Sequence, residues 1–175
     1  VIFFGNEFFD AIPIKQFIKK GKKYFEKYYT LDRDKILYET FEKAKISDIN
    51  KIESFKVFNR TGFIEYPKLG FIELDRITNI INENSGVILL IDYGYLNFKN
   101  KSTLQAVMDN KKVSLKDFSR KFGNVVLTYL VNFNLLKEYF LKNNLKVKKI
   151  VSQKFFLEKM CIVERAKILE KRMND

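Results

Sequence analysis

Residues 87–94 have the sequence VILLIDYG, in which five consecutive apolar residues are followed by Asp92, Tyr93 and Gly94. An apolar run of this length without alternation is typical of a strand buried on both faces of a parallel sheet. The preceding residues predict a helix of about four turns, because apolar side chains recur at helical spacing from residue 71 to residue 81. Helix, tight turn and buried strand together indicate an α/β fold.

The same alternation of helices and strands is predicted on either side of this stretch. The first residues, 1–4, are apolar without alternation and predict another strand buried on both faces. Asn134 is the predicted N-cap of a helix, residues 146–151 predict a short strand, and residues 154–172 have helical spacing. We therefore expect an α/β sandwich around a mainly parallel sheet with helices on both faces.

A lysine-rich and aromatic stretch interrupts this pattern at residues 14–42. Residues 31–34, Leu-Asp-Arg-Asp, have the composition of a turn, so we interpret the stretch as a hairpin-like, β-rich insertion. Residues 43–66 contain Ser, Asn, Asp and Gly and are predicted to be a surface connection. The insertion would then occupy residues 14–66.

The composition excludes several kinds of chemistry. The chain of 175 residues has no histidine, which excludes Ser-His-Asp and Cys-His catalysis, and the single cysteine, Cys161, leaves no ligand set for zinc and no disulfide. The net charge of +12 fits nucleic acid or an acidic membrane surface as a partner, but 27 of the 33 basic residues are lysines, whereas phosphate and base recognition favours arginine. No apolar run approaches the ~20 residues of a membrane-spanning helix, so we expect a soluble, intracellular protein without membrane insertion.

Polar residues follow both predicted buried strands. Asn6, Glu7 and Asp10 come after the first strand and Asp92 after the second. Ligands of open α/β sheets bind beyond the carboxyl ends of the strands, so three carboxylates and an amide could face one crevice. The alternative is that each is a turn former or helix cap. Together they favour a site for a cation, which could be a hard metal ion, a guanidinium or an amino group.

The spacing of the glycines matches no phosphate-binding loop. The seven glycines stand alone, and neither a GxGxxG nor a Walker sequence is present. A nucleotide-cradling loop therefore cannot be located in this chain.

Five segments in order resemble those of one protein family. Residues 6–17, NEFFDAIPIKQF, closely resemble the NEFFDALP segment of the MidA family of S-adenosylmethionine-dependent methyltransferases. LIDYG at 90–94 resembles its IDYGH strand end, and TLQAV at 103–107 occurs in the family unchanged. Residues 127–133 resemble its LTAHVDF, and residues 152–165 its terminal TQGEFL…R segment.

The resemblance implies a class I, Rossmann-like methyltransferase sheet, of which this chain is the carboxyl-terminal portion. The family's glycine-rich cofactor loop and ribose-binding acid precede NEFFD, so we expect the amino-terminal cofactor-binding half to lie outside residues 1–175. We also expect these residues alone to be inactive and to bind S-adenosylmethionine weakly or not at all. Tyr95, Asn110 and Cys161 stand where the family usually has His, His and Gly.

The family includes the mitochondrial protein arginine methyltransferase needed for complex I assembly. The resemblance therefore implies S-adenosylmethionine as cofactor and an arginine of a protein, such as a respiratory complex I subunit, as acceptor. Glu7 and Asp10 would clamp the guanidinium, and Asn6 would orient the acceptor or the cofactor. The expected location is the bacterial cytoplasm, or the mitochondrial matrix in a eukaryote.

The remaining expected substrate or cofactor contacts lie in the same motifs. Asp92, Tyr93 and Gly94 would border the pocket from the second strand, and Gln105 would contribute from TLQAV. Phe8 and Phe9 have two alternative interpretations. They are either core residues or a wall that excludes water beside the sulfonium.

Two other functions fit parts of the sequence. Nucleic-acid amino-methyltransferases place Asn or Asp, two residues and an aromatic after this strand, which residues 6–9 match loosely, and flipped bases suit a basic surface. A non-catalytic fragment could instead dock another protein through the aromatic residues of 17–38. The oligomeric state is open, with a homodimer as one alternative.

Overall fold

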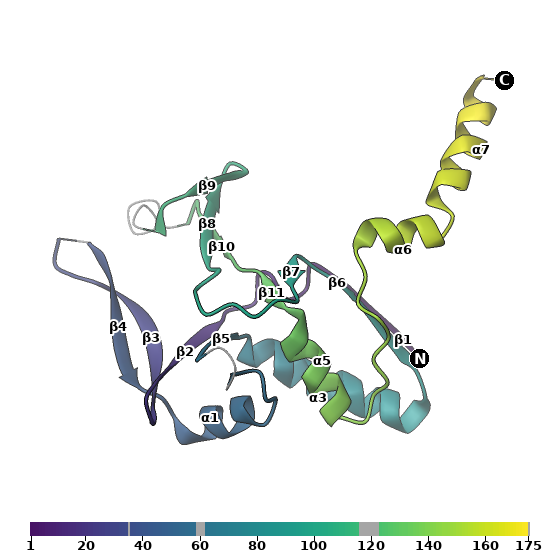
Figure 1. The fold of residues 1–175 in the computed structure, drawn as a ribbon. Helices are drawn as coiled ribbons and strands as arrows, with labels where there is room; N and C mark the ends of the chain where they lie inside the picture. The colour runs from purple at the N-terminus through teal and green to yellow at the C-terminus, as the bar shows by residue number, and fades with distance from the viewer. Residues whose placement is uncertain (35, 59–61, 116–122, 175) are drawn as a thin grey trace.

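The computed structural model describes residues 1–34, 36–58, 62–115 and 123–174. The fold is mixed α/β, with two parallel strand pairs and two antiparallel sheets (Figure 1). The strands are β1 (Ile2–Asn6), β2 (Lys15–Lys20), β3 (Lys23–Leu31), β4 (Leu37–Lys43), β5 (Phe63–Tyr66), β6 (Val87–Ile91), β7 (Gly94–Tyr95), β8 (Gln105–Met108), β9 (Lys111–Val113), β10 (Val126–Thr128) and β11 (Val131–Asn132). The helices are α1 (Ile46–Glu53), α3 (Lys68–Asn84), α5 (Phe133–Lys142), α6 (Gln153–Lys159) and α7 (Ile162–Asn174).

The predicted helix, turn and strand at residues 67–91 are confirmed as α3 and β6. Pro67 precedes α3, and Ser85 ends it with a φ of 54°. β6 pairs in parallel with β1, and Asn6 lies opposite Ile91 at the end of the ladder. Because the strands run in the same direction, the residues after β1 and after β6 emerge at the same edge.

The insertion forms a four-stranded antiparallel sheet in the order β4-β3-β2-β5. The β3–β4 hairpin turns near residues 31–34 as predicted, and one Asp32 side-chain oxygen accepts the N–H groups of Asp34 at 2.9 Å and Ile36 at 2.8 Å. The prediction of a surface connection at 43–66 is wrong. This segment contains α1 and β5, and all four residues of β5 are buried.

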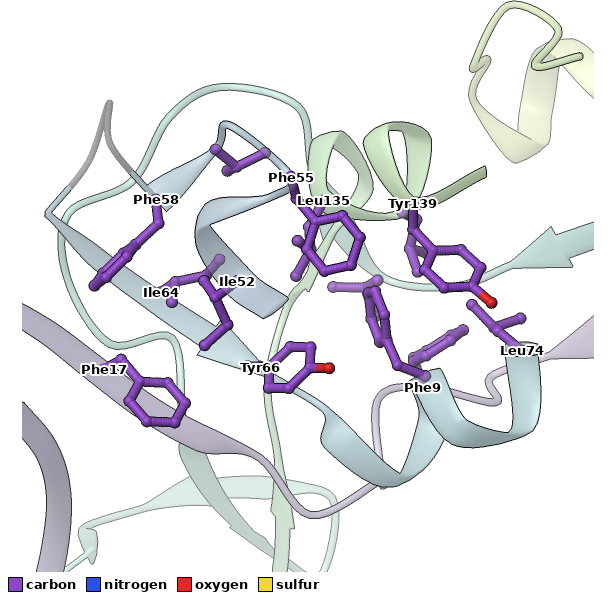
Figure 2. Close-up of a cluster of buried hydrophobic side chains, with 14 of the residues drawn as sticks. Phe9, Phe17, Ile52, Phe55, Phe58, Ile64, Tyr66, Leu74, Leu135 and Tyr139 are labelled. Carbon is purple, nitrogen blue, oxygen red and sulfur yellow. The ribbon is translucent and has the colours of Figure 1, made fainter. Parts of the chain in front are cut away.

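The core lies where this sheet, α1, α3 and α5 meet (Figure 2). Aromatic rings fill it, and the rings of Phe71 and Tyr139 pack edge to face with centroids 4.9 Å apart. Phe55 and Ile52 reach this core from the segment of α1, at 1% and 0% exposure. The local polarity of residues 43–66 concealed this contribution because these apolar side chains are separated by polar ones.

Three further predictions differ from the structure. Ile2 and Phe4 in β1 are 81% and 65% exposed and no residue of β6 is fully buried, so neither strand is buried on both faces within residues 1–175. Residues 146–151 form no strand. The N-cap of α5 is Asn132 rather than Asn134, because the Asn132 side chain accepts the Leu135 N–H at 3.2 Å.

The strand pairing also departs from the expected mainly parallel sheet. Parallel pairing is found for β1 with β6 and for β11 with β7, whereas the other described ladders are antiparallel. The helical spacing at 154–172 corresponds to two helices, α6 and α7, separated at Cys161, which has a φ of 61°. No residue of α6 and none of residues 162–173 in α7 is buried, and α7 projects away from the rest of the chain (Figure 1).

Candidate functional site

Glu7 marks a sharp change of chain direction immediately after β1. Its φ of 50° is in the left-handed region, which costs a residue with a side chain roughly 1–2 kcal/mol. The Glu7 N–H still donates to the Ile91 carbonyl at 2.8 Å, so the turn is fixed against β6. Such conformations cluster at functional sites, where the surrounding structure maintains them.

The turn brings the Glu7 side chain to Tyr93, which follows β6. The Tyr93 hydroxyl donates to Glu7 Oε1 at 3.0 Å. The hydrogen bond and the negative charge of Glu7 raise the pKa of Tyr93. Both side chains are exposed at the shared edge of the two strands. The structure therefore brings together residues from the two predicted strand ends.

Asp92 links the two loops through the main chain. Its Oδ2 accepts the Phe9 N–H and its Oδ1 the Tyr93 N–H, each at 2.8 Å. Burial raises the pKa of the Asp92 carboxyl and the charge of Asp10 acts in the same direction, while the N–H groups of Phe9, Tyr93 and Asp10 act in the opposite direction. Both Asp92 oxygens are engaged by the protein, so Asp92 shapes the site by holding the loop of residues 7–10.

Asp10 is fixed through its backbone while its carboxylate stays available. Its carbonyl oxygen accepts the Thr128 hydroxyl at 3.1 Å and the Tyr129 N–H at 3.4 Å. Among the described residues, the Asp10 carboxylate has no ion pair. Together with Glu7, it gives the loop after β1 two acidic side chains without a cation.

The other predicted residues of the first motif divide between surface and core. Asn6 is exposed beside Glu7, and Phe8 is 37% exposed. Phe9 is 1% exposed and packs in the core, so its side chain does not form a wall of the site; only its N–H takes part, through Asp92. A β-carbon added at Gly70 would lie 2.6 Å from the Phe9 ring, which shows how tightly α3 packs here.

Gly94 and Gln105 have local structural explanations. A β-carbon at Gly94 would lie 2.3 Å from the Val131 carbonyl oxygen, so glycine permits the close approach of β11. Gln105 is half-buried in β8 and lies opposite Thr128, the residue that donates to Asp10. Their predicted contacts with substrate or cofactor stay predictions.

Sequence reasoning missed Glu65 in β5, which is 2% exposed. Its Oε1 accepts Gln16 Nε2 at 2.9 Å and the N–H groups of Thr103 at 2.9 Å and Leu104 at 3.2 Å. The Thr103 hydroxyl donates to Oε2 and accepts the Leu130 N–H at 3.0 Å. Glu65 thus ties the insertion to the TLQAV segment and, through Thr103, to Leu130 in the connection between β10 and β11.

No local pattern identifies this role of Glu65, because its donors come from segments 37 or more residues away in sequence. The one available signal is Thr103 in TLQAV, whose hydroxyl connects Glu65 to Leu130.

The three positions that depart from the family pattern have structural settings of their own. Burial raises the pKa of Tyr95 to about 12, and the Lys99 ammonium lies 4.7 Å from the centre of its ring. Asn110 has a φ of 58° in the turn between β8 and β9, and Cys161 is the exposed residue between α6 and α7.

In the part of the chain that the structure describes, no group of three His, Cys, Asp or Glu side chains could hold a metal ion. Within the same residues, no helix combines the length and the apolar character needed to cross a bilayer.

A model of a family of S-adenosyl-L-methionine-dependent methyltransferases matches residues 1–151. The chain belongs to this family. The predicted family membership is therefore confirmed, and with it S-adenosylmethionine as the family's cofactor.

Relatives and solved structures give the same picture. The chain is 29% identical over 138 residues to a mitochondrial "protein arginine methyltransferase NDUFAF7 homolog" of Caenorhabditis elegans, covering 77% of this chain and 32% of that protein. A crystal structure of a superfamily member and "likely methyl transferase" of Burkholderia thailandensis, bound to S-adenosyl-homocysteine, matches with a TM-score of 0.58 at 14% identity. A native structure from the same organism and superfamily matches with a TM-score of 0.59 at 14% identity.

The structural matches cover 81% of this chain and 37% and 38% of the two solved chains. The chain therefore spans about a third of the length of the proteins it matches. The shared architecture confirms a partial methyltransferase fold.

The side chains at the strand ends fit one part of the cofactor. S-adenosylmethionine carries a sulfonium cation, and the exposed Phe8 and Tyr93 offer two aromatic rings, whose faces attract a cation. Their place beyond the carboxyl ends of parallel strands is where open α/β sheets bind ligands.

Proposed function

We propose that the protein containing residues 1–175 transfers a methyl group to an arginine side chain of a protein, and that Glu7 and Asp10 hold the guanidinium. The single observation that carries this proposal is the difference among the acids of the site. Both carboxylate oxygens of Asp92 accept hydrogen bonds from backbone N–H groups. In contrast, Glu7 is exposed, and Asp10 forms no ion pair among the described residues.

The chemistry requires such a pair of carboxylates. S-adenosylmethionine, when bound, supplies the methyl group on a positively charged sulfur. Glu7 and Asp10 would accept guanidinium N–H groups and keep its positive charge away from the nitrogen that forms the new bond. One guanidinium proton must leave as that bond forms, and a clamp carboxylate can accept it and pass it to water. Alignment of the acceptor nitrogen is worth many kcal/mol by proximity alone.

Tyr93 and Asn6 would assist this clamp from either side. The Tyr93 hydroxyl fixes one Glu7 oxygen and leaves the other free for the acceptor. Asn6, exposed at the end of β1, would orient the acceptor or the cofactor through its amide.

The choice of a protein arginine as acceptor rests on the C. elegans relative, whose name describes a mitochondrial protein arginine methyltransferase. A complex I subunit as substrate and a location in the mitochondrial matrix follow from the family resemblance and belong to the same proposal. In a bacterium the expected location is the cytoplasm.

The test is methylation by the complete gene product that contains residues 1–175. The enzyme is incubated with labelled S-adenosylmethionine and, separately, with extracted protein, RNA and DNA. We expect label in protein, recovered as methylarginine after hydrolysis. Label in nucleic acid alone would instead support the amino-methyltransferase alternative and overturn the arginine proposal.

Glu7→Gln tests the clamp in the same enzyme. We expect the methylation rate to fall by at least about a hundredfold while cofactor affinity changes by less than about twofold, because the lost charge faces the acceptor. Glu83→Gln, an exposed site at the end of α3, is the matched control and should retain full activity. Normal turnover in Glu7→Gln would remove Glu7 from the mechanism.

A further inference from the structure

A second feature of the molecule is a groove between the β3–β4 hairpin and the β8–β9 hairpin. Its volume is about 400 Å³, within the range of roughly 300–1,000 Å³ typical of ligand-binding clefts. Tyr29, Leu37 and Tyr38 line it from the insertion, and Leu104, Gln105 and Lys112 line it from the opposite side. The two hairpins stand apart at the same end of the molecule (Figure 1).

The groove adjoins the proposed acceptor site. Gln105, which lines the groove, lies opposite Thr128 in the β8–β10 ladder. The Thr128 hydroxyl donates to the Asp10 carbonyl at 3.1 Å. One pair of strand residues therefore separates the groove from the loop that carries the clamp.

The strands that line the groove have edges suited to an extended chain. β4 is the outermost described strand of the four-stranded sheet, and β9 is the outermost described strand of the three-stranded sheet. Such an edge can pair with the main chain of an extended peptide, and alternate side chains of that peptide then enter pockets. Tyr29, Leu37 and Tyr38 would receive the apolar side chains.

The charges of the groove favour an acidic occupant. The Glu39 carboxylate is neutralised by an ion pair with Lys27. Lys112 of β9, which lines the groove, is exposed and forms no ion pair within residues 1–34, 36–58, 62–115 and 123–174. The uncompensated charge on the groove is therefore positive.

We propose that this groove binds an extended segment of the protein acceptor in which acidic side chains alternate with apolar ones. The apolar side chains contact Tyr29, Leu37 and Tyr38, and the acidic side chains on the other face of the segment approach Lys112. Successive side chains of a strand point to opposite faces, which gives the alternation. The inference rests on the proposed function, because the groove would deliver the acceptor to Glu7 and Asp10.

The first test is selection from a pooled random-peptide library by the immobilised complete gene product. We expect enrichment of peptides that alternate Asp or Glu with Leu, Ile, Phe or Val. Lys112→Glu and the neutral Lys112→Gln should each lose the acidic preference, and Tyr38→Ala should lose the apolar preference. Lys149→Glu, an exposed lysine after α5, is the matched charge control and should select as the wild type does. A lack of acidic enrichment, or enrichment that survives both Lys112 variants, overturns the proposal.

The second test separates this inference from the proposed function. In methylation assays with extracted protein, Lys112→Glu should raise KM for the acceptor about tenfold with kcat unchanged, because the groove contributes binding and not the transfer step. An unchanged KM in an active Lys112→Glu enzyme would overturn the proposal for the groove without affecting the proposed function. If the wild-type enzyme did not methylate protein but still selected acidic peptides, the proposed function would be wrong and the groove would remain a peptide-binding site.

Discussion

The buried carboxylate of Glu65 in the insertion and the exposed carboxylate of Glu7 after β1 belong to the same residue type but have opposite surroundings. Glu65 is 2% exposed and accepts hydrogen bonds from a side-chain amide, two hydroxyls and two N–H groups. Glu7 is exposed and has one partner, the hydroxyl of Tyr93. A buried charge must be satisfied by its own protein, whereas an exposed one can exchange water for a ligand.

Asp48 shows a second way to satisfy a buried carboxylate. Its oxygens form ion pairs with Lys15 Nζ at 3.0 Å and Lys68 Nζ at 2.6 Å. Burial works to raise the pKa of Asp48, but the two ammonium groups outweigh it and hold the pKa below its ordinary value. Asp92, bonded to N–H groups without an ammonium, has its pKa raised by burial instead. The comparison shows that a carboxylate with a structural role can be recognised by the N–H or ammonium groups that its oxygens contact.

Glu65→Ala should have the largest effect on stability. The change leaves the buried Gln16 amide and the Thr103 and Leu104 N–H groups without their acceptor, which should lower the free energy of unfolding by about 3–5 kcal/mol. Urea unfolding followed by circular dichroism measures it, with exposed Glu83→Ala as the control. A loss as small as that of Glu83→Ala would mean that Glu65 does not anchor the insertion.

Asp48→Asn should have an intermediate effect that depends on pH. Its pKa is lowered on folding, so Asp48 stabilises the fold above the unfolded-state value near 3.8, and this contribution is lost as the pH falls through the lower folded value. At neutral pH we expect the variant to be about 1–2 kcal/mol less stable, since both lysines are partly exposed and screened. Unfolding curves from neutral pH to below pH 3.8 test this. A difference that grew towards acid would contradict the assigned sign.

Glu7→Gly should have the smallest effect on stability, with the opposite sign. Glycine adopts a φ of 50° without the strain of a side chain, so the variant should be as stable as the wild type or more stable by up to about 1 kcal/mol. Thermal unfolding measures this, and the same variant should lose methyl transfer. A large loss of stability would mean that Glu7, like Glu65, has a structural role.

The sequence predicted the elements whose information is local. α3 and β6 follow from apolar spacing and an unbroken apolar run, and the β3–β4 turn follows from the composition of residues 31–34. The partners of α1 and β5 could not be predicted in this way. Their side chains are buried by segments distant in sequence, so the local polarity of residues 43–66 was misleading.

The candidate site shows the same division. Asn6, Glu7, Asp10 and Asp92 could be identified because residues after parallel strands meet at one edge, whatever the details of packing. The sequence did not show that these residues have different roles. Asp92 differs from the other acids because it accepts the N–H groups of Phe9 and Tyr93, and Phe9 is a core residue because it packs against α3.

The sequence by itself determined the strand ends at which the acids lie and the family to which the chain belongs, because both depend on residue order over short stretches. The tertiary structure alone decided which acids are satisfied internally and which stay open. It also decided that Gln105 and Lys112 face Tyr38 across a groove. Hydrogen-bond donors, ammonium groups and burial come from segments far apart in the chain, and only folding brings them to a carboxylate.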